Sequence, residues 1–184
     1  MATHRFRHRP HRQAGVTLIE QIMAVAVMGV LAVVAMPALS QMQARHEVQT
    51  AQMDFISALQ HARATAAIGG GPALFCPSRD GTHCSDEARW EGGWLLARDP
   101  THAGQPATVL RTGGAYAHIV VLGDAGRHSI RFRGDGSAGG STNTWRICRR
   151  GHPEQALVVV VSNAGRVRGA PASAEQAASC AAAQ

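Results

Sequence analysis

The sequence predicts an α+β protein in which a long N-terminal helix is followed by a β-rich domain. Apolar residues first form a continuous run and then recur every three or four positions up to Ile68, which is helical spacing. Beyond Gly69 the chain changes to short apolar runs separated by clusters of Gly, Asp, Ser and Pro, the pattern of strands and turns. A length of 184 residues suits one such domain with an appendage.

Residues 1–15 form a basic leader. They contain four of the 18 basic residues, all of them arginine, and none of the 12 acidic residues. The chain from Val16 onward carries 14 arginines against 12 acids, so its net charge is +2, compared with +6 for the whole chain. Most of the basicity is therefore a property of the leader.

Residues 16–39 form a hydrophobic segment that is apolar enough to cross a membrane. The eighteen residues from Ile22 to Leu39 are uncharged, close to the minimum length of a spanning helix. The simplest interpretation is a single-pass anchor whose basic end stays in the cytoplasm. That interpretation leaves Glu20 unexplained, because a carboxylate at the bilayer centre costs roughly 2.5 kcal/mol or more. A secretory signal is also disfavoured, since no small-residue cleavage site follows the run.

Residues 40–68 continue the same helix with an amphipathic pattern. One apolar stripe is predicted, and we expect it to lie against a sheet. The stripe consists of Val48, Ala51, Phe55, Leu59, Ala62 and Ala66. The helix should end at Ile68, because the following Gly-Gly-Gly-Pro cannot readily continue it.

Residues 72–184 are expected to form a globular β head. Ile130 and Phe132 should point to one face of their strand, with Arg131 and Arg133 on the other. The continuous apolar run from Leu157 to Val161 indicates a strand buried on both faces. The expected strands are Ala73–Cys76, Trp94–Arg98, Val109–Thr112, Ala117–Leu122, His128–Arg133, Thr144–Cys148 and Leu157–Ser162.

All four cysteines, Cys76, Cys84, Cys148 and Cys180, follow the hydrophobic segment. An even number on that side suits two disulfides in an oxidising compartment. Three pairings are possible; the seven-residue gap favours Cys76–Cys84, which leaves Cys148–Cys180. Zinc is the alternative, since His83 adjoins Cys84, but the C-x-x-C spacing of zinc sites is absent.

No enzyme is predicted. The sequence has no G-x-S-x-G, H-E-x-x-H or phosphate-loop motif, and its histidines lack a fixed carboxylate neighbour in sequence. The Asp80-Gly81 and Gly134-Asp135-Gly136 stretches lack the acid density of a calcium loop, and turns explain them better. We therefore expect no catalytic residues, no cofactor and no metal.

The stretch GVTLIE, from Gly15 to Glu20, resembles the class III signal of type IV pilins and type II secretion pseudopilins. The resemblance implies that a prepilin peptidase cuts after Gly15 and methylates Val16, although phenylalanine is usual at that position. It also implies that Glu20 pairs with the N-terminal ammonium of a neighbouring subunit, which explains an acid in apolar surroundings. Gly29 and Pro37 match the family's helix-weakening positions, and proline makes a kink or break there expected in any case.

The head resembles the GspH/FimT family of minor pilins, over roughly Gly15 to Arg168. The similar stretches are SALQHARA at 57–64, CPS at 76–78, WEGGWLL at 90–96 and VVSNAGRVR at 160–168. The resemblance implies a pilin-like fold, a long N-terminal helix packed on an antiparallel β-sheet head. The implied partners are the prepilin peptidase, other pilins or pseudopilins, and the bacterial inner membrane. The helix would lie first in that membrane, with the head periplasmic, and then in a pilus or pseudopilus fibre. The tail from Gly169 resembles nothing, and only Cys180 suggests that it is anchored.

The candidate binding element is Gly165-Arg166-Val167-Arg168, after a turn at Asn163-Ala164-Gly165. In an extended chain Arg166 and Arg168 lie on one face, about 6–7 Å apart, with Val167 turned inward. Arginine binds phosphate bidentately and stays charged, so two such side chains form a compact anion-binding edge. In the FimT branch this G-R-x-R element is associated with DNA binding during uptake for natural transformation, which implies that role for Gly165, Arg166 and Arg168.

Charge clustering adds weaker candidates. From Arg127 to Arg168 there are eight arginines against two acids, a local charge of +6. The additional DNA-binding candidates are Arg131, Arg133, Arg149 and Arg150. The alternative is a structural minor pilin or type II secretion pseudopilin that primes fibre assembly without binding DNA, and whose arginines contact a neighbouring subunit.

Overall fold

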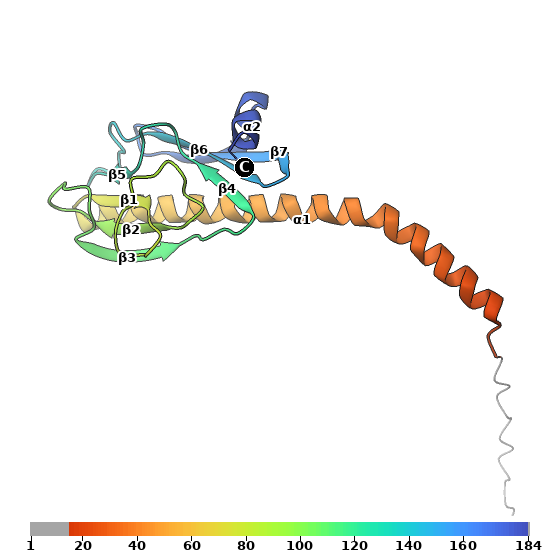
Figure 1. Ribbon diagram of the computed structural model, residues 1–184. Helices are drawn as coiled ribbons and strands as arrows, with labels where there is room; N and C mark the ends of the chain where they lie inside the picture. Colours follow the sequence, from red (N-terminus) through yellow and green to blue (C-terminus); the bar gives the residue numbers. More distant parts are fainter. Residues whose placement is uncertain (1–14, 184) are drawn as a thin grey trace, which may run out of the picture. The chain divides into compact units, whose positions relative to one another are not determined.

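The computed structural model describes residues 15–183, which contain one long helix, eight strands and a short C-terminal helix (Figure 1). Apart from Gly15, the expected leader lies outside the described residues. The chain divides into two compact units, residues 1–40 and residues 41–184.

The first unit contains the start of helix α1 (Leu18–Gly69). The large apolar side chains at 18–33 and at 36–39 are exposed. Within residues 15–183, α1 is the one helix that is long and apolar enough to cross a membrane. Pro37 lies inside α1 without ending it, so the break that was one expected outcome is absent. A proline removes only its own N–H donor, and the turns on either side can continue the helix.

In the second unit, the predicted apolar stripe of α1 is buried. Every predicted stripe residue is 0–1% exposed, and Ala44 and Ala58 extend the stripe. The ring of Phe55 lies 5.8 Å from that of Phe75 and 5.9 Å from that of Trp145, centroid to centroid. α1 ends at Gly69, one residue beyond the prediction, where Gly70 takes the left-handed φ of 62° that favours glycine after a helix.

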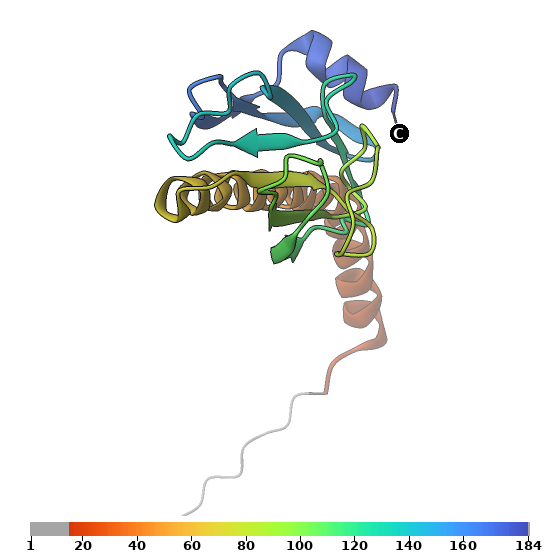
Figure 2. The same cartoon turned by 90° about the vertical axis from the view of Figure 1, so that its left-hand side faces the viewer.

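The strands form two antiparallel four-stranded sheets that pack against this half of α1 (Figure 1, Figure 2). The strand order is β3-β2-β1-β5 in the first sheet and β4-β6-β7-β8 in the second. The strands are β1 (Ala73–Pro77), β2 (Trp94–Arg98), β3 (Thr108–Gly113), β4 (Ile119–Leu122), β5 (Ile130–Phe132), β6 (Asn143–Arg149), β7 (His152–Val161) and β8 (Val167–Pro171). The predicted fold class is confirmed, and the head proves to have two sheets.

Strand β7 is covered on both faces, as its apolar run predicts. Val159 and Val161 belong to the main core with the α1 stripe. Ala156 belongs to a second cluster with Cys148 and Cys180, against which the short helix α2 (Ala174–Ala181) packs. The alternation in β5 is also confirmed, since Ile130 and Phe132 are fully buried.

The tail forms two elements that were not predicted as such, β8 and α2. β8 pairs with β7 through the register Val160 to Arg168, and α2 begins with a reciprocal capping box between Ser173 and Gln176. The S-x-x-Q spacing is a sequence signal for this helix start. The disulfide Cys148–Cys180 then ties α2 to β6.

The cysteines pair in the way that loop length favours. Cys76 bonds to Cys84 and Cys148 to Cys180, across 8 and 32 residues respectively. Cys84 is therefore in a disulfide, and the zinc alternative loses its cysteine ligand. Among residues 15–183, no three or more His, Cys, Asp or Glu side chains are grouped so that they could hold a metal ion.

Candidate functional site

The candidate site begins at the tight turn that joins β7 to β8. The Gly165 N–H donates to the Ser162 carbonyl at 2.8 Å, and the Ser162 N–H donates to the Arg166 carbonyl at 3.1 Å. The Arg166 N–H also donates to the Ser162 hydroxyl oxygen at 3.2 Å. These bonds confirm the turn predicted before Arg166 and fix the backbone at the start of the G-R-x-R element.

Gly165 is required by its surroundings as well as by the turn. Its φ is 72°, in the left-handed region that side chains other than glycine rarely adopt. A Cβ at this position would lie 2.0 Å from the Gly136 carbonyl oxygen, which belongs to the loop between β5 and β6. The glycine thus allows the turn and this loop to touch through their backbones.

Three elements meet at this contact. The Asn163 carbonyl accepts from the Ala138 N–H at 3.0 Å, which holds the turn to the β5–β6 loop. Arg63, on α1, donates from Nε to the Gly136 carbonyl at 3.0 Å. The turn, the loop and the helix therefore form one hydrogen-bonded unit, so the residues that follow Gly165 start from a fixed position.

Arg166 and Arg168 are both exposed. Among residues 15–183 no carboxylate lies within 4 Å of either guanidinium. Val167, between them, is half-buried and packs against the main core, in agreement with the inward orientation predicted for it. Both arginines therefore keep their charge and their hydrogen-bonding capacity for a ligand.

The weaker candidates divide into two groups. Arg131 pairs with Asp99, whose side chain is fully buried, and Arg149 pairs with Glu47 on α1 at 3.1 Å between Nε and Oε2. These pairs offset the charge of Arg131 and Arg149, which weakens the charge argument for them, and a DNA-binding role for either stays a prediction. Arg133 and Arg150 are exposed, and the Arg133 guanidinium donates to the Gly139 carbonyl at 3.4 Å. A role for Arg133 and Arg150 stays a prediction.

Sequence reasoning missed Arg63, which lines a pocket of about 470 Å³ together with Arg166. The other lining residues are Gln60, Ala64, Ala67, Asp135, Gly136 and Val167. Helical spacing leaves Arg63 outside the apolar stripe and gives no indication of its neighbours. Local sequence could not place it beside Arg166. The hydrogen bond that joins α1 to this region, from Arg63 to the Gly136 carbonyl, spans 73 residues.

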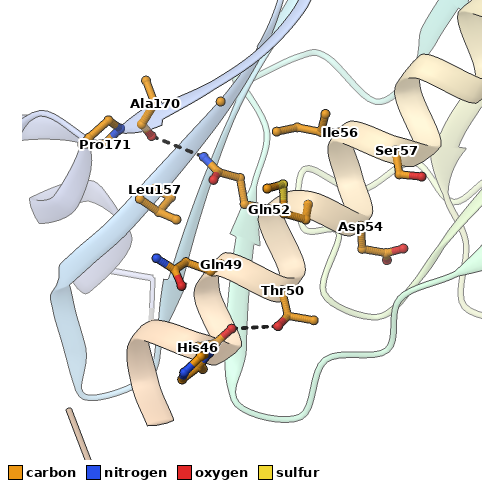
Figure 3. Close-up of a pocket in the computed structure, with 12 residues that line it drawn as sticks. His46, Gln49, Thr50, Gln52, Asp54, Ile56, Ser57, Leu157, Ala170 and Pro171 are labelled. Atoms are coloured by element: carbon orange, nitrogen blue, oxygen red, sulfur yellow. Dashed lines mark hydrogen bonds between the residues drawn. The ribbon is translucent and has the colours of Figure 1, made fainter. Parts of the chain in front are cut away.

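A larger groove, of about 1000 Å³, lies between α1 and β8 and has a different character (Figure 3). Gln52 bridges it, donating from its amide to the Val158 carbonyl at 2.8 Å and to the Ala170 carbonyl at 3.4 Å. A Cβ at Gly169 would meet this amide at 2.8 Å, so the strand lies close to the helix there. Its lining residues include no arginine, and Gln52 connects α1 to β7 and β8 across it.

The residues of the N-terminal signal lie at the start of α1 and just before it. Val16 and Glu20 are exposed, and Gly29 lies within α1 with open space around it. The expected roles of Gly15, Val16, Glu20, Gly29 and Pro37 concern a peptidase or a neighbouring chain, so they stay predictions.

Comparison with known families decides the class of protein. The family described as Type II transport protein GspH matches residues 51–165, more than half of the chain. The chain belongs to the GspH family. The motif described as Prokaryotic N-terminal methylation motif matches residues 10–36. Together they confirm the resemblance drawn from GVTLIE and from the head, and no curated protein matches the sequence.

Two crystal structures of the type IV minor pilin FimU from Pseudomonas aeruginosa PAO1, in space groups P21 and P65, are similar to this GspH-family chain. The identities are 23% and 21%, and the TM-scores are 0.57 and 0.55. The matches cover 69% and 67% of this chain and 90% and 92% of the FimU chains. At these identities the similarity establishes the pilin fold alone.

The GspH-family chain is therefore a minor pilin or pseudopilin. Membership implies processing by a prepilin peptidase and association with other pilins. The signal and the apolar helix fit a membrane-anchored component of a pilus or pseudopilus. The family is structural and is not known for enzymatic activity.

Replacing Gly165 by alanine tests the close contact with Gly136. We expect the left-handed φ to cost about 1–2 kcal/mol and the clash to add to that, since the carbonyl oxygen would have to move. Gly126→Ala is the matched control, because Gly126 has a φ of 74° with no atom within 4 Å of the added Cβ. Urea unfolding of residues 41–184 measures both variants, and equal losses would contradict the contact.

Proposed function

We propose that this minor pilin binds DNA without sequence preference through Arg166 and Arg168, and that it serves DNA uptake in natural transformation as a pilus subunit. The observation that carries the proposal is the state of these two arginines. They are exposed beside a fixed turn, and no carboxylate among residues 15–183 pairs with them. Arg131 and Arg149, in contrast, already have carboxylate partners.

The chemistry of this edge suits phosphate groups. Alternate residues of a strand lie about 6–7 Å apart, which is comparable to the spacing of phosphates along one nucleic-acid strand. A guanidinium binds phosphate through two parallel N–H donors, and phosphate contacts carry no sequence information. Binding should therefore be weak per subunit, independent of sequence and steeply dependent on salt.

Duplex binding by residues 41–184 tests the role of the two arginines. This fragment contains every residue found buried, from Ala44 to Cys180. We expect R166Q/R168Q to abolish the anisotropy change of a labelled duplex at low salt, since both phosphate contacts are lost. R45Q/R98Q removes the same charge from exposed sites elsewhere that have no carboxylate within 4 Å among residues 15–183, and it should bind almost normally. Unchanged binding by R166Q/R168Q, or equal losses in both double variants, would refute the assignment.

We also propose how the chain matures and assembles. The prepilin peptidase removes the leader, residues 1–15, by cutting after Gly15, and methylates Val16. Residues 16–39 lie first in the bacterial inner membrane and then in the fibre core, where Glu20 meets the N-terminal amine of a neighbour. Gly29 and Pro37 let this segment extend locally. Residues 40–68 support the head, residues 72–184, which is periplasmic and is later displayed on the fibre.

Processing can be read from the mature N-terminus. Mass spectrometry of protein from the membrane fraction should find methylated Val16 as the first residue, because the peptidase acts at the Gly15–Val16 bond. A chain that still begins at Met1 in cells containing the peptidase would exclude this maturation.

A second candidate function is structural, and the match to a family described as a type II transport protein favours it. In this case the subunit primes a pilus or secretion pseudopilus, and the arginines contact a neighbouring subunit. A deletion strain complemented with R166Q/R168Q separates the two functions. We expect normal fibres with lost transformation, because only the DNA contacts are removed. Lost fibres or lost secretion would support the structural function instead.

A further inference from the structure

The pocket beside the β7–β8 turn is shared between two arginines that are distant in the sequence. Arg166 enters it from the turn, and Arg63 enters it from α1. Asp135, from the β5–β6 loop, lines the same pocket. The pocket thus combines two cations and one anion at the element proposed to bind DNA.

We propose that Arg63 is a third phosphate-binding residue of this site and that Asp135 limits the affinity of the site for nucleic acid. The inference rests on the proposed function and extends it from the β8 edge to the surface of α1. It makes the site two-sided, with Arg166 and Arg168 on one side and Arg63 on the other.

A hydrogen bond orients the Arg63 guanidinium, and its charge is not paired with a carboxylate of the described residues. Nε donates to the Gly136 carbonyl at 3.0 Å, while no carboxylate among the described residues lies within 4 Å of the side chain. Nη1 and Nη2 have no protein acceptor among residues 15–183, so both can bind a phosphate. A guanidinium that is already oriented loses less conformational entropy when it binds a ligand.

Two glycines make room for this arrangement. A Cβ at Gly136 or at Gly165 would each lie 3.3 Å from the Arg63 Nε. The glycine of the G-R-x-R element therefore admits the helix arginine as well as forming the turn. On the helix side, the small side chains of Ala64 and Ala67 line the pocket and leave its volume open.

Asp135 is the opposing charge. Its Oδ1 accepts from the Ser137 N–H at 2.8 Å, and hydrogen bonds from Ser137 hold the pKa of the Asp135 carboxyl below its ordinary value. The group is ionised at neutral pH, yet it forms no ion pair with Arg63 or Arg166. A phosphate entering the pocket meets this carboxylate, and the repulsion weakens binding.

Two single substitutions with opposite expected signs test the inference. R63Q should weaken duplex binding about tenfold, the equivalent of one charge-assisted contact. It should also reduce the slope of log K against log salt by about 0.9, the value for one phosphate contact. D135N should tighten binding about threefold, since it removes the repulsion and keeps the oxygen that accepts from Ser137. Both are measured on the full chain in nonionic detergent and on residues 41–184.

Matched controls are available for each charge change. R45Q removes a positive charge from α1 about 27 Å along the helix from Arg63. D86N removes an exposed negative charge from another loop, with a side chain that is 92% exposed. Neither should change the salt slope, and thermal unfolding checks that all four variants are folded.

The possible outcomes distinguish a failure of this inference from a failure of the proposed DNA binding. If R63Q binds more weakly with an unchanged salt slope, Arg63 only positions the turn and the inference is wrong. It is also wrong if D135N binds no more tightly than the D86N control. If R166Q/R168Q abolishes binding while R63Q and D135N match the wild type, only the inference fails. If the wild type does not bind duplex DNA at low salt, the proposed function and the inference both fail.

Discussion

The packing of two β-sheets on one face of α1 is the constraint on which the rest of the head depends. Phe55 contacts Phe75 in the first sheet and Trp145 in the second, and their rings lie within 6 Å. Most of the neighbouring stripe positions are alanine, which lets the strands approach the helix closely. Although only 4% of the chain is aromatic, all three tryptophans are fully or almost fully buried in this core. A few large side chains thus compensate for a composition rich in alanine and glycine.

The same packing brings together three segments that carry the candidate site. The end of α1, the β5–β6 loop and the β7–β8 turn meet at the Gly136 carbonyl, which accepts from Arg63 and leaves no room for a Cβ at Gly165. Arg63 and Arg166 lie beside the turn, and neither has a carboxylate partner among residues 15–183. The head in this way presents uncompensated arginines on a backbone that is fixed by hydrogen bonds.

In the basic part of the head, from Arg127 to Arg168, some arginines have carboxylate partners and others have none among the described residues. Arg131, Arg146 and Arg149 are each paired with a carboxylate from another part of the chain. Asp99 is fully buried, and it also accepts from the backbone N–H groups of the β2–β3 loop, so its arginine is a structural requirement. A local charge of +6 in sequence therefore overstates the charge that the surface presents.

The sequence by itself determined the features that depend on residues close together in the chain. These are the apolar N-terminal helix, the buried stripe, the alternation in β5, the turn before Arg166, and the family resemblance. It did not determine that the strands form two sheets, because the pairings of β1 with β5 and of β4 with β6 join separated segments. The start of α2 was missed although its S-x-x-Q spacing is a local signal. Nor could it show which arginines have partners in the fold, since the partner of Arg131 lies 32 residues away and that of Arg63 lies 73 residues away. Only the tertiary structure decided which charges are neutralised, because a carboxylate or a carbonyl acts on whatever the fold places within a few ångströms of it.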